Sequence, residues 1–111
     1  MDLVQFNEAY RALLDSGEWY IEPHRGEIRL TRKAAEGCTC PVSAVASHRF
    51  GRFFSASDYG PAAHALGLPW VEALYLTQIA DYGGSQIDLL GCTVDLLGCG
   101  RRHCLDRPFR V

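Results

Sequence analysis

The feature that most constrains the fold of this chain is a turn that contains proline and glycine. It lies between two short runs in which apolar and polar residues alternate. Residues 18–22 and 27–32 each alternate apolar with polar side chains, and Pro23 and Gly26 lie between the two runs. This arrangement is typical of a β-hairpin, in which a tight turn joins two antiparallel strands. Two strands alone are marginally stable, so the hairpin must pack on helices or gain another strand.

Helical patterns precede and follow this hairpin. Leu3, Phe6, Tyr10 and Leu13 recur three or four residues apart after Asp2, which predicts a capped helix over residues 3–16. After a loop at 33–40, further helices are predicted from Pro41 to near Gly51 and over residues 58–66, 69–82 and 86–98. The sequence therefore predicts the α+β class: a mainly helical domain consisting of one helix, one β-hairpin and then three or four helices.

The last two predicted helices have contrasting patterns. The helix over 69–82 is apolar nearly all round, which is typical of a helix in the middle of a core or an interface. The segment 86–98 overlaps a heptad duplication, in which Asp-Leu-Leu-Gly-Cys occurs at 88–92 and again at 95–99. Read as a helix, it has a heptad seam that can pack internally or pair with a second copy in a homodimer. The seam residues are Ile87, Leu90, Val94 and Leu97.

Length and composition indicate one domain over residues 1–111, because 48% of the residues are hydrophobic and a chain of 111 residues can bury a core. The net charge of −2 gives no general attraction to nucleic acid or to anionic membranes. No apolar run approaches ~18 residues and the first residues do not resemble a secretion signal, so we expect a soluble cytoplasmic protein without a membrane partner. The tail 101–111 is basic, and we expect it to fold back onto the domain.

Five cysteines raise the hypothesis of a metal site. Structural zinc usually takes four Cys or His ligands in two close pairs, and this chain offers two loosely spaced groups. Because the spacing matches no standard pattern, we expect no cofactor, and a zinc-stabilised module is the alternative. A disulfide is a further alternative that a cytosolic setting disfavours. The candidate zinc ligands are Cys38, Cys40, Cys99, His103 and Cys104, whereas Cys92 is expected in the core.

Cys40 is also the candidate nucleophile of a thiol enzyme. It immediately precedes Pro41 at a predicted helix N-terminus, where the helix dipole favours a thiolate and lowers the thiol pKa. A nucleophile also needs a base within hydrogen-bond reach, and the sequence does not pair Cys40 with any of its four histidines. Catalysis is therefore an alternative, and a non-enzymatic protein is the expectation.

Residues 62–71 have the outline of a helix-turn-helix, with a small-residue helix, a glycine and a second helix. A recognition helix offers basic and amide side chains to DNA, but here Gln78 is the one plausible reader. No lysine or arginine lies between Arg52 and Arg101, which disfavours duplex binding. We expect an αα-hairpin that does not bind nucleic acid.

Aromatic residues point to a protein partner. The chain has two Trp, five Tyr and five Phe, and residues 49–54 mix arginine with phenylalanine. Aromatic residues and arginine are enriched at the centres of protein interfaces. We therefore expect a protein-binding module, with homo-oligomerisation as a variant of the same role. The candidate binding residues are Arg49, Arg52, Phe53, Phe54, Trp70 and Tyr75.

Several short motifs between residues 19 and 82 resemble those of small uncharacterised bacterial and phage accessory proteins. They are Trp19-x-Ile21, Gly26-x-Ile28-Arg29, Cys40-Pro41-x-x-Ala44-Val45-Ala46, Ala62-Ala63-x-x-Leu66-Gly67-Leu68-Pro69 and Ile79-Ala80-Asp81. The resemblance implies a protein directed at a host or phage component, such as an inhibitor of a host defence protein. It implies no catalytic residues and leaves out the C-terminal cysteines.

Overall fold

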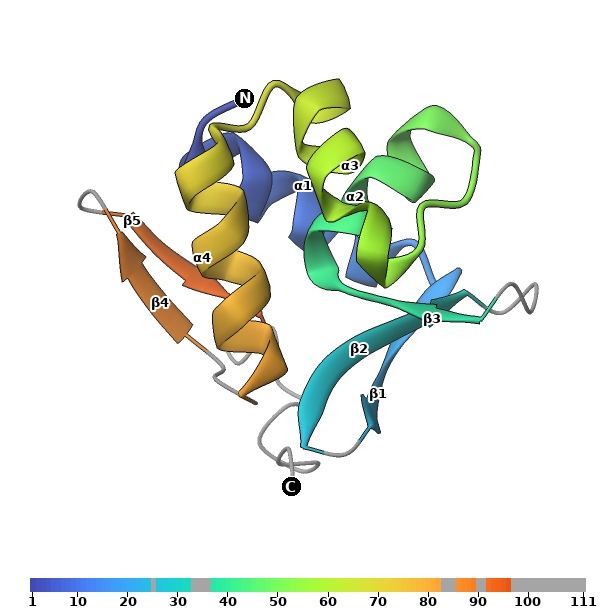
Figure 1. Cartoon of the computed structure of the whole chain (residues 1–111). Helices are drawn as coiled ribbons and strands as arrows, with labels where there is room; N and C mark the ends of the chain where they lie inside the picture. Colours follow the sequence, from blue (N-terminus) through green and yellow to red (C-terminus); the bar gives the residue numbers. More distant parts are fainter. Residues whose placement is uncertain (25, 33–36, 83–85, 90–91, 97–111) are drawn as a thin grey trace.

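The computed structural model describes residues 1–24, 26–32, 37–82, 86–89 and 92–96, and it confirms the α+β class (Figure 1). Helix α1 precedes a three-stranded sheet, further helices follow, and a second hairpin comes last. The elements are α1 (Leu3–Asp15), β1 (Trp19–His24), β2 (Glu27–Arg32), β3 (Cys38–Thr39), α2 (Pro41–Phe50), the 3₁₀ helix η1 (Ala56–Asp58), α3 (Tyr59–Leu66), α4 (Trp70–Asp81), β4 (Gln86–Leu89) and β5 (Cys92–Asp95).

Helix α1 begins with a capping box. Asp2 Oδ1 accepts from the Gln5 backbone N–H at 2.8 Å, and Gln5 Oε1 accepts from the Asp2 N–H at 2.9 Å. These two bonds satisfy donors that the first turn of a helix leaves unpaired. The buried stripe of α1 is the predicted set: Leu3, Phe6, Tyr10 and Leu13.

The predicted hairpin is confirmed, and it gains a third strand. Strands β1 and β2 pair antiparallel with Ile21 opposite Leu30. The segment expected to be only a loop contains β3, which pairs with β2 through Leu30↔Thr39 and gives the order β1-β2-β3. Ile28 and Leu30 are fully buried on the helical side, where β2 contacts α2 and α4.

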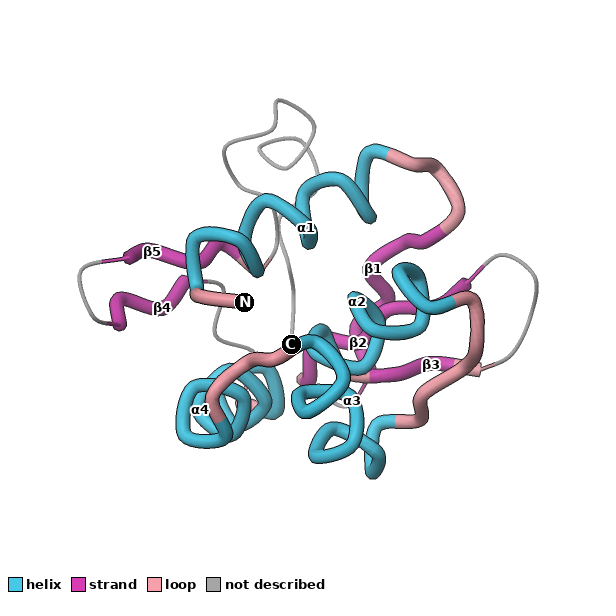
Figure 2. Tube along the Cα trace, turned by 90° about the horizontal axis from the view of Figure 1, so that it is seen from above, coloured by secondary structure: helices cyan, strands magenta, loops and turns pink. Residues whose placement is uncertain are grey.

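Helix α2, rather than the more apolar α4, lies at the centre of the fold (Figure 2). It contacts α1, α3, α4 and β2, and its residues from Pro41 to Ser47 are all buried. Small side chains such as Ser43, Ala44 and Ala46 allow neighbouring elements to approach it from several sides. The helix ends at Gly51, whose φ of 71° is left-handed and therefore suits glycine. Of the two places expected for the apolar helix over 69–82, the middle of the core is taken by α2, and a place in an interface stays a prediction.

The helix predicted over residues 86–98 was also wrong. Strands β4 and β5 form an antiparallel hairpin there, with Gln86 opposite Asp95 and Leu89 opposite Cys92. Both strands alternate polar and apolar residues, and the β-branched Ile87, Thr93 and Val94 favour extended backbone. Within the described part of the duplicated sequence, residues 88, 89, 92 and 95 lie in strands, so the heptad seam loses its helical basis there. Leu90 and Leu97 of that seam lie outside the described residues.

The second hairpin is attached to the first helix. The buried Tyr10 hydroxyl donates to the Leu96 carbonyl at 2.5 Å, and the Asp95 N–H lies 3.4 Å from Asn7 Oδ1. Val94 and Leu96 are fully buried in the same core as Phe6. None of the helices in the described part of the chain is long and apolar enough to cross a membrane.

Candidate protein-binding surface

Helix α4 faces the domain with polar as well as small residues and faces outward with large apolar ones. Its buried residues are Glu72, Ala73, Leu76, Thr77 and Ala80. Trp70, Val71, Tyr75 and the C-cap residue Tyr82 are 53%, 72%, 41% and 86% exposed, respectively. Helical geometry places them on one arc of roughly 140°. We call this arc the outer face of α4 and define it by its uncharged residues, which are Trp70, Val71, Leu74, Tyr75, Gln78 and Tyr82. By helical spacing Asp81 falls at the edge of the same arc, and its carboxylate is paired with Arg29.

The indole of Trp70 is held in place by the start of α3. Its ring stacks on Tyr59, with centroids 5.4 Å apart and planes 16° from parallel. Gly60 lies against the same ring, because a Cβ at that position would stand 3.3 Å from Trp70 Cζ3. Glycine therefore gives the indole room beside Tyr59, and about half of the Trp70 surface remains open to solvent. The largest side chain of the outer face is thus ordered before any partner arrives.

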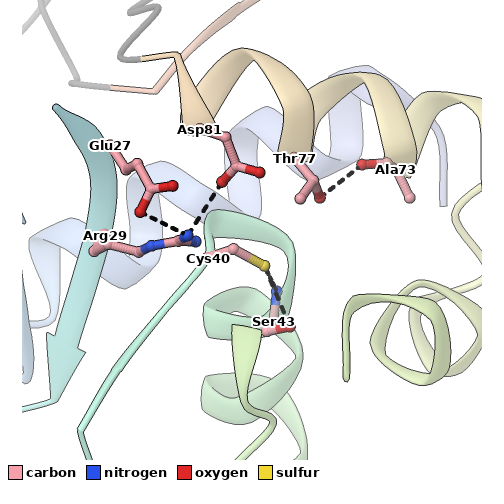
Figure 3. A network of polar contacts seen from close by, with 7 residues as sticks. All are labelled: Glu27, Arg29, Cys40, Ser43, Ala73, Thr77 and Asp81. Atoms are coloured by element: carbon pink, nitrogen blue, oxygen red, sulfur yellow. Dashed lines mark hydrogen bonds and ion pairs between the residues drawn. The ribbon is translucent and has the colours of Figure 1, made fainter. Parts of the chain in front are cut away.

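Polar contacts attach the C-terminal end of α4 to the sheet (Figure 3). Arg29 Nη2 of β2 lies 3.0 Å from Glu27 Oε1 and 3.2 Å from Asp81 Oδ1 at the end of α4. On the same side of α4, the Thr77 hydroxyl donates to the Ala73 carbonyl at 2.9 Å. Because Arg29 is nearly buried between two carboxylates, it joins α4 to β2 and fixes which side of α4 faces outward.

Burial raises the pKa of Asp81, and Glu27 acts in the same direction, whereas Arg29 opposes them. The folded state therefore holds the Asp81 proton at a pH where the unfolded chain releases it. Stability from this group is fully present below the ordinary aspartate pKa of about 4 and is lost as pH rises through the folded pKa. We expect Asp81→Asn to remove this decline. In urea unfolding from pH 4 to 7, the unfolding free energy of the variant should therefore rise relative to that of wild type. Glu8→Gln, at an exposed position of α1, is the control. Parallel pH profiles for wild type and Asp81→Asn would contradict the raised pKa of Asp81.

The structure separates the predicted binding residues. Trp70 and Tyr75 are exposed on α4, whereas Arg49, Arg52 and Phe53 lie at the end of α2 and just after it. Arg49 borders an open hollow of about 500 Å³ together with Gln5 and Glu8. The sixth residue, Phe54, is a core residue whose ring is covered by the Arg52 guanidinium at 4.1 Å.

Sequence reasoning missed Val71, Leu74, Gln78 and Tyr82 as neighbours of Trp70 and Tyr75. Their spacing of three, four, seven or eight residues places them on one helix face, and that pattern is visible in the sequence. The missing information was which side of a helix apolar nearly all round faces the core. Glu72 and Thr77 would have suggested the opposite side, because polar residues are expected outside.

Cys40 is a buried helix cap. Its Sγ accepts the Ser43 N–H at 3.5 Å, and the thiol donates to Ser43 Oγ at 3.3 Å. Burial raises the pKa of this thiol more than the Ser43 hydrogen bonds and Arg29 lower it. The expectation of a lowered Cys40 pKa was therefore wrong, because desolvation outweighs the helix N-terminus.

The proposed zinc ligands fall into different environments. Cys38 is exposed and Cys40 is buried, and both are free thiols. Cys99, His103 and Cys104 lie outside the described residues, as does the basic tail. Within the described ranges, no group of three or more His, Cys, Asp or Glu side chains is arranged to hold a metal ion. Cys92 lies in strand β5 rather than in a helix, and its expected place in the core stays a prediction.

The α3–α4 pair has the predicted outline of two helices joined by a short turn. Gly67 ends α3 with a φ of 70°, and the Leu68 N–H donates to the Ala63 carbonyl at 2.9 Å. The outer face of α4 presents aromatic rings and one amide where a DNA-reading helix presents basic groups.

Comparisons of this chain with protein-family models, curated proteins and solved structures find no match.

Proposed function

We propose that this protein is a binding module that docks another protein on the outer face of α4. The observation that supports the proposal most is the exposure of Trp70, Val71, Tyr75 and Tyr82 on one largely apolar helix face. Together they expose on the order of 500 Å² of mainly apolar surface. A patch of this size lies near the upper end for a monomer and commonly marks an interaction surface.

The Trp70 ring is already held in place in the free protein, and this also favours binding. Tyr59 and Gly60 already restrict the Trp70 ring, so docking a partner costs less side-chain entropy there. Tryptophan and tyrosine are enriched among the residues that dominate interface energies. The resemblance to bacterial and phage accessory proteins implies a host or phage component as the partner, such as a host defence protein, and that identity stays a prediction.

We expect the double substitution Trp70→Ala/Tyr75→Ala to reduce capture of the partner at least about tenfold, because two anchor rings are lost. Wild-type and variant proteins are used as bait in host lysate, and bound proteins are quantified by mass spectrometry. Each side chain is about half exposed and the Trp70 ring stacks on Tyr59, so the unfolding free energy should fall by about 1–2 kcal/mol.

Tyr20→Ala/Val4→Ala is the matched control, because Tyr20 and Val4 are as exposed as Tyr75 and Trp70 but lie on β1 and α1. A supporting result is a protein that wild type and control capture equally and that the α4 variant loses. Equal capture by all three baits, or no specific capture by wild type, would contradict the proposal.

A further inference from the structure

We infer that the outer face of α4 takes a basic amphipathic segment of its protein partner, with arginine or lysine side chains seated at its two ends. The inference rests on the proposed function and adds the chemistry of the partner. Three observations carry it: the charges around the face, the arginine–aromatic contacts elsewhere in the domain, and the spacing of the two ends.

Carboxylates flank the outer face, and among the residues that the structure describes few cations lie near it. No lysine or arginine occurs between Arg52 and Arg101, whereas this stretch contains five acidic residues. Exposed Asp58 immediately precedes Tyr59, the stacking partner of Trp70, and half-buried Asp81 immediately precedes Tyr82. At the Asp81 end, the cation that the structure places there is Arg29, which also pairs with Glu27. At the other end, the amino group of Met1 donates to the Gly67 carbonyl. Both ends of the face therefore favour an approaching positive charge.

The domain itself shows how it accommodates arginine on aromatic rings. Arg32 lies 4.7 Å from the centroid of the Trp19 ring, and Arg52 lies 4.1 Å from that of Phe54. Within the described part of the chain, no guanidinium lies over Trp70. Its open ring offers a negative π-face, which attracts a guanidinium. Asp58, the neighbour of Tyr59 in sequence, adds a negative charge at this end of the face, although its Oδ2 already accepts from the Ser55 hydroxyl at 2.9 Å.

The length of α4 sets the spacing that the partner must match. Twelve residues at 1.5 Å rise separate its ends by about 18 Å. Val71, Leu74 and Tyr75 lie between those ends, so the partner segment needs apolar residues in its middle and basic residues about 18 Å apart. An amphipathic helix of some four turns has this pattern. A second copy that paired through this same face fits less well, because its face would bring the same carboxylates and, in the part of the chain that the structure describes, no cation.

Three synthetic 18-residue helical peptides test the inference. Each has the same leucine positions, and the polar positions are all arginine, all glutamine or all glutamate. Anisotropy of the labelled peptide is measured against the full chain at 50 and 300 mM salt. We expect the arginine peptide to bind about tenfold more tightly than the glutamine peptide and the glutamate peptide to bind most weakly, with the difference shrinking at high salt. Trp70→Ala should lower the affinity for the arginine peptide about tenfold, and Asp58→Asn should lower it about threefold. Tyr20→Ala should bind this peptide as wild type does.

Each other outcome overturns the inference in a distinguishable way. If glutamine and arginine peptides bind equally and Trp70→Ala weakens both, the docking face stands but its partner is not basic. If Trp70→Ala binds the arginine peptide as wild type does, the peptide contacts another surface. If no peptide binds and light scattering shows a dimer that Trp70→Ala dissociates, the occupant is a second copy. If no peptide binds and wild type and Trp70→Ala are both monomers, the docking face loses its support as well.

Discussion

Phe54→Ala is expected to lower the unfolding free energy by about 3–5 kcal/mol, the usual cost of truncating a buried phenylalanine. The side chain is only 2% exposed. The backbone around it is also fixed in the core, because its N–H donates to Ser47 Oγ at 2.7 Å and its carbonyl accepts from Thr39 Oγ1 at 2.8 Å. Truncation would leave a cavity that the bonded neighbours cannot readily fill. Urea unfolding followed by circular dichroism measures the loss.

Phe50→Ala is the matched comparison, since Phe50 lies four residues earlier at the end of α2 and is 46% exposed. It should change the unfolding free energy by less than about 1 kcal/mol. The pair decides between the two roles considered for the aromatic cluster at 49–54. If Phe54→Ala kept wild-type stability and instead lost a protein partner, the burial described for this ring would be wrong.

Tyr10→Phe is expected to show an effect that depends strongly on pH. At pH 8 the variant should be less stable than wild type by about 1–3 kcal/mol, because the buried Leu96 carbonyl loses its donor. Burial raises the pKa of Tyr10 above its ordinary value of about 10, and the charges of Asp95 and Cys40 add to the effect. The folded state therefore keeps a proton that the unfolded chain releases at alkaline pH.

The raised pKa fixes the direction of the alkaline change. Stability from the Tyr10 proton is fully present below pH 10 and is lost above it, at about 1.4 kcal/mol per pH unit. Phenylalanine has no proton to lose, so the stability gap between Tyr10→Phe and wild type should narrow as pH rises from 10 to 11. Tyr82→Phe, on an exposed ring, is the control. A gap that stays constant between pH 8 and 11 would show that Tyr10 ionises equally in both states.

The elements that could be predicted from the sequence are those with local boundary signals. Asp2 caps α1, Pro41 begins α2, and Gly51 and Gly67 end α2 and α3, so these helices follow from short-range chemistry. The segment 86–98 carried conflicting periods, because leucines seven residues apart suggest a helix while alternation suggests strands. Its conformation is coupled to contacts such as the one between Tyr10 and Leu96, which are 86 positions apart. A local pattern does not contain such a contact.

The candidate surface could be predicted in part. The number of aromatics predicts Trp70 and Tyr75 as binding residues, and the structure places both at the surface, but the same reasoning also selects the buried Phe54. The number of large rings does not tell which of them a small domain can enclose. That choice depends on α2, whose run of buried small residues occupies the centre and leaves one face of α4 in solvent. Packing of this kind is decided by several elements at once.

The hydrogen bond between Tyr10 and Leu96 also bears on how the protein is made. On a ribosome α1 emerges first, and the strand that completes its packing emerges nearly a full domain later. The apolar stripe of α1 therefore lacks its contact with β5 while most of the chain is synthesised. Completion of the native core is for this reason expected as a late event of biosynthesis, and a nascent chain stalled before residue 94 would expose the hydrophobic surface that chaperones bind.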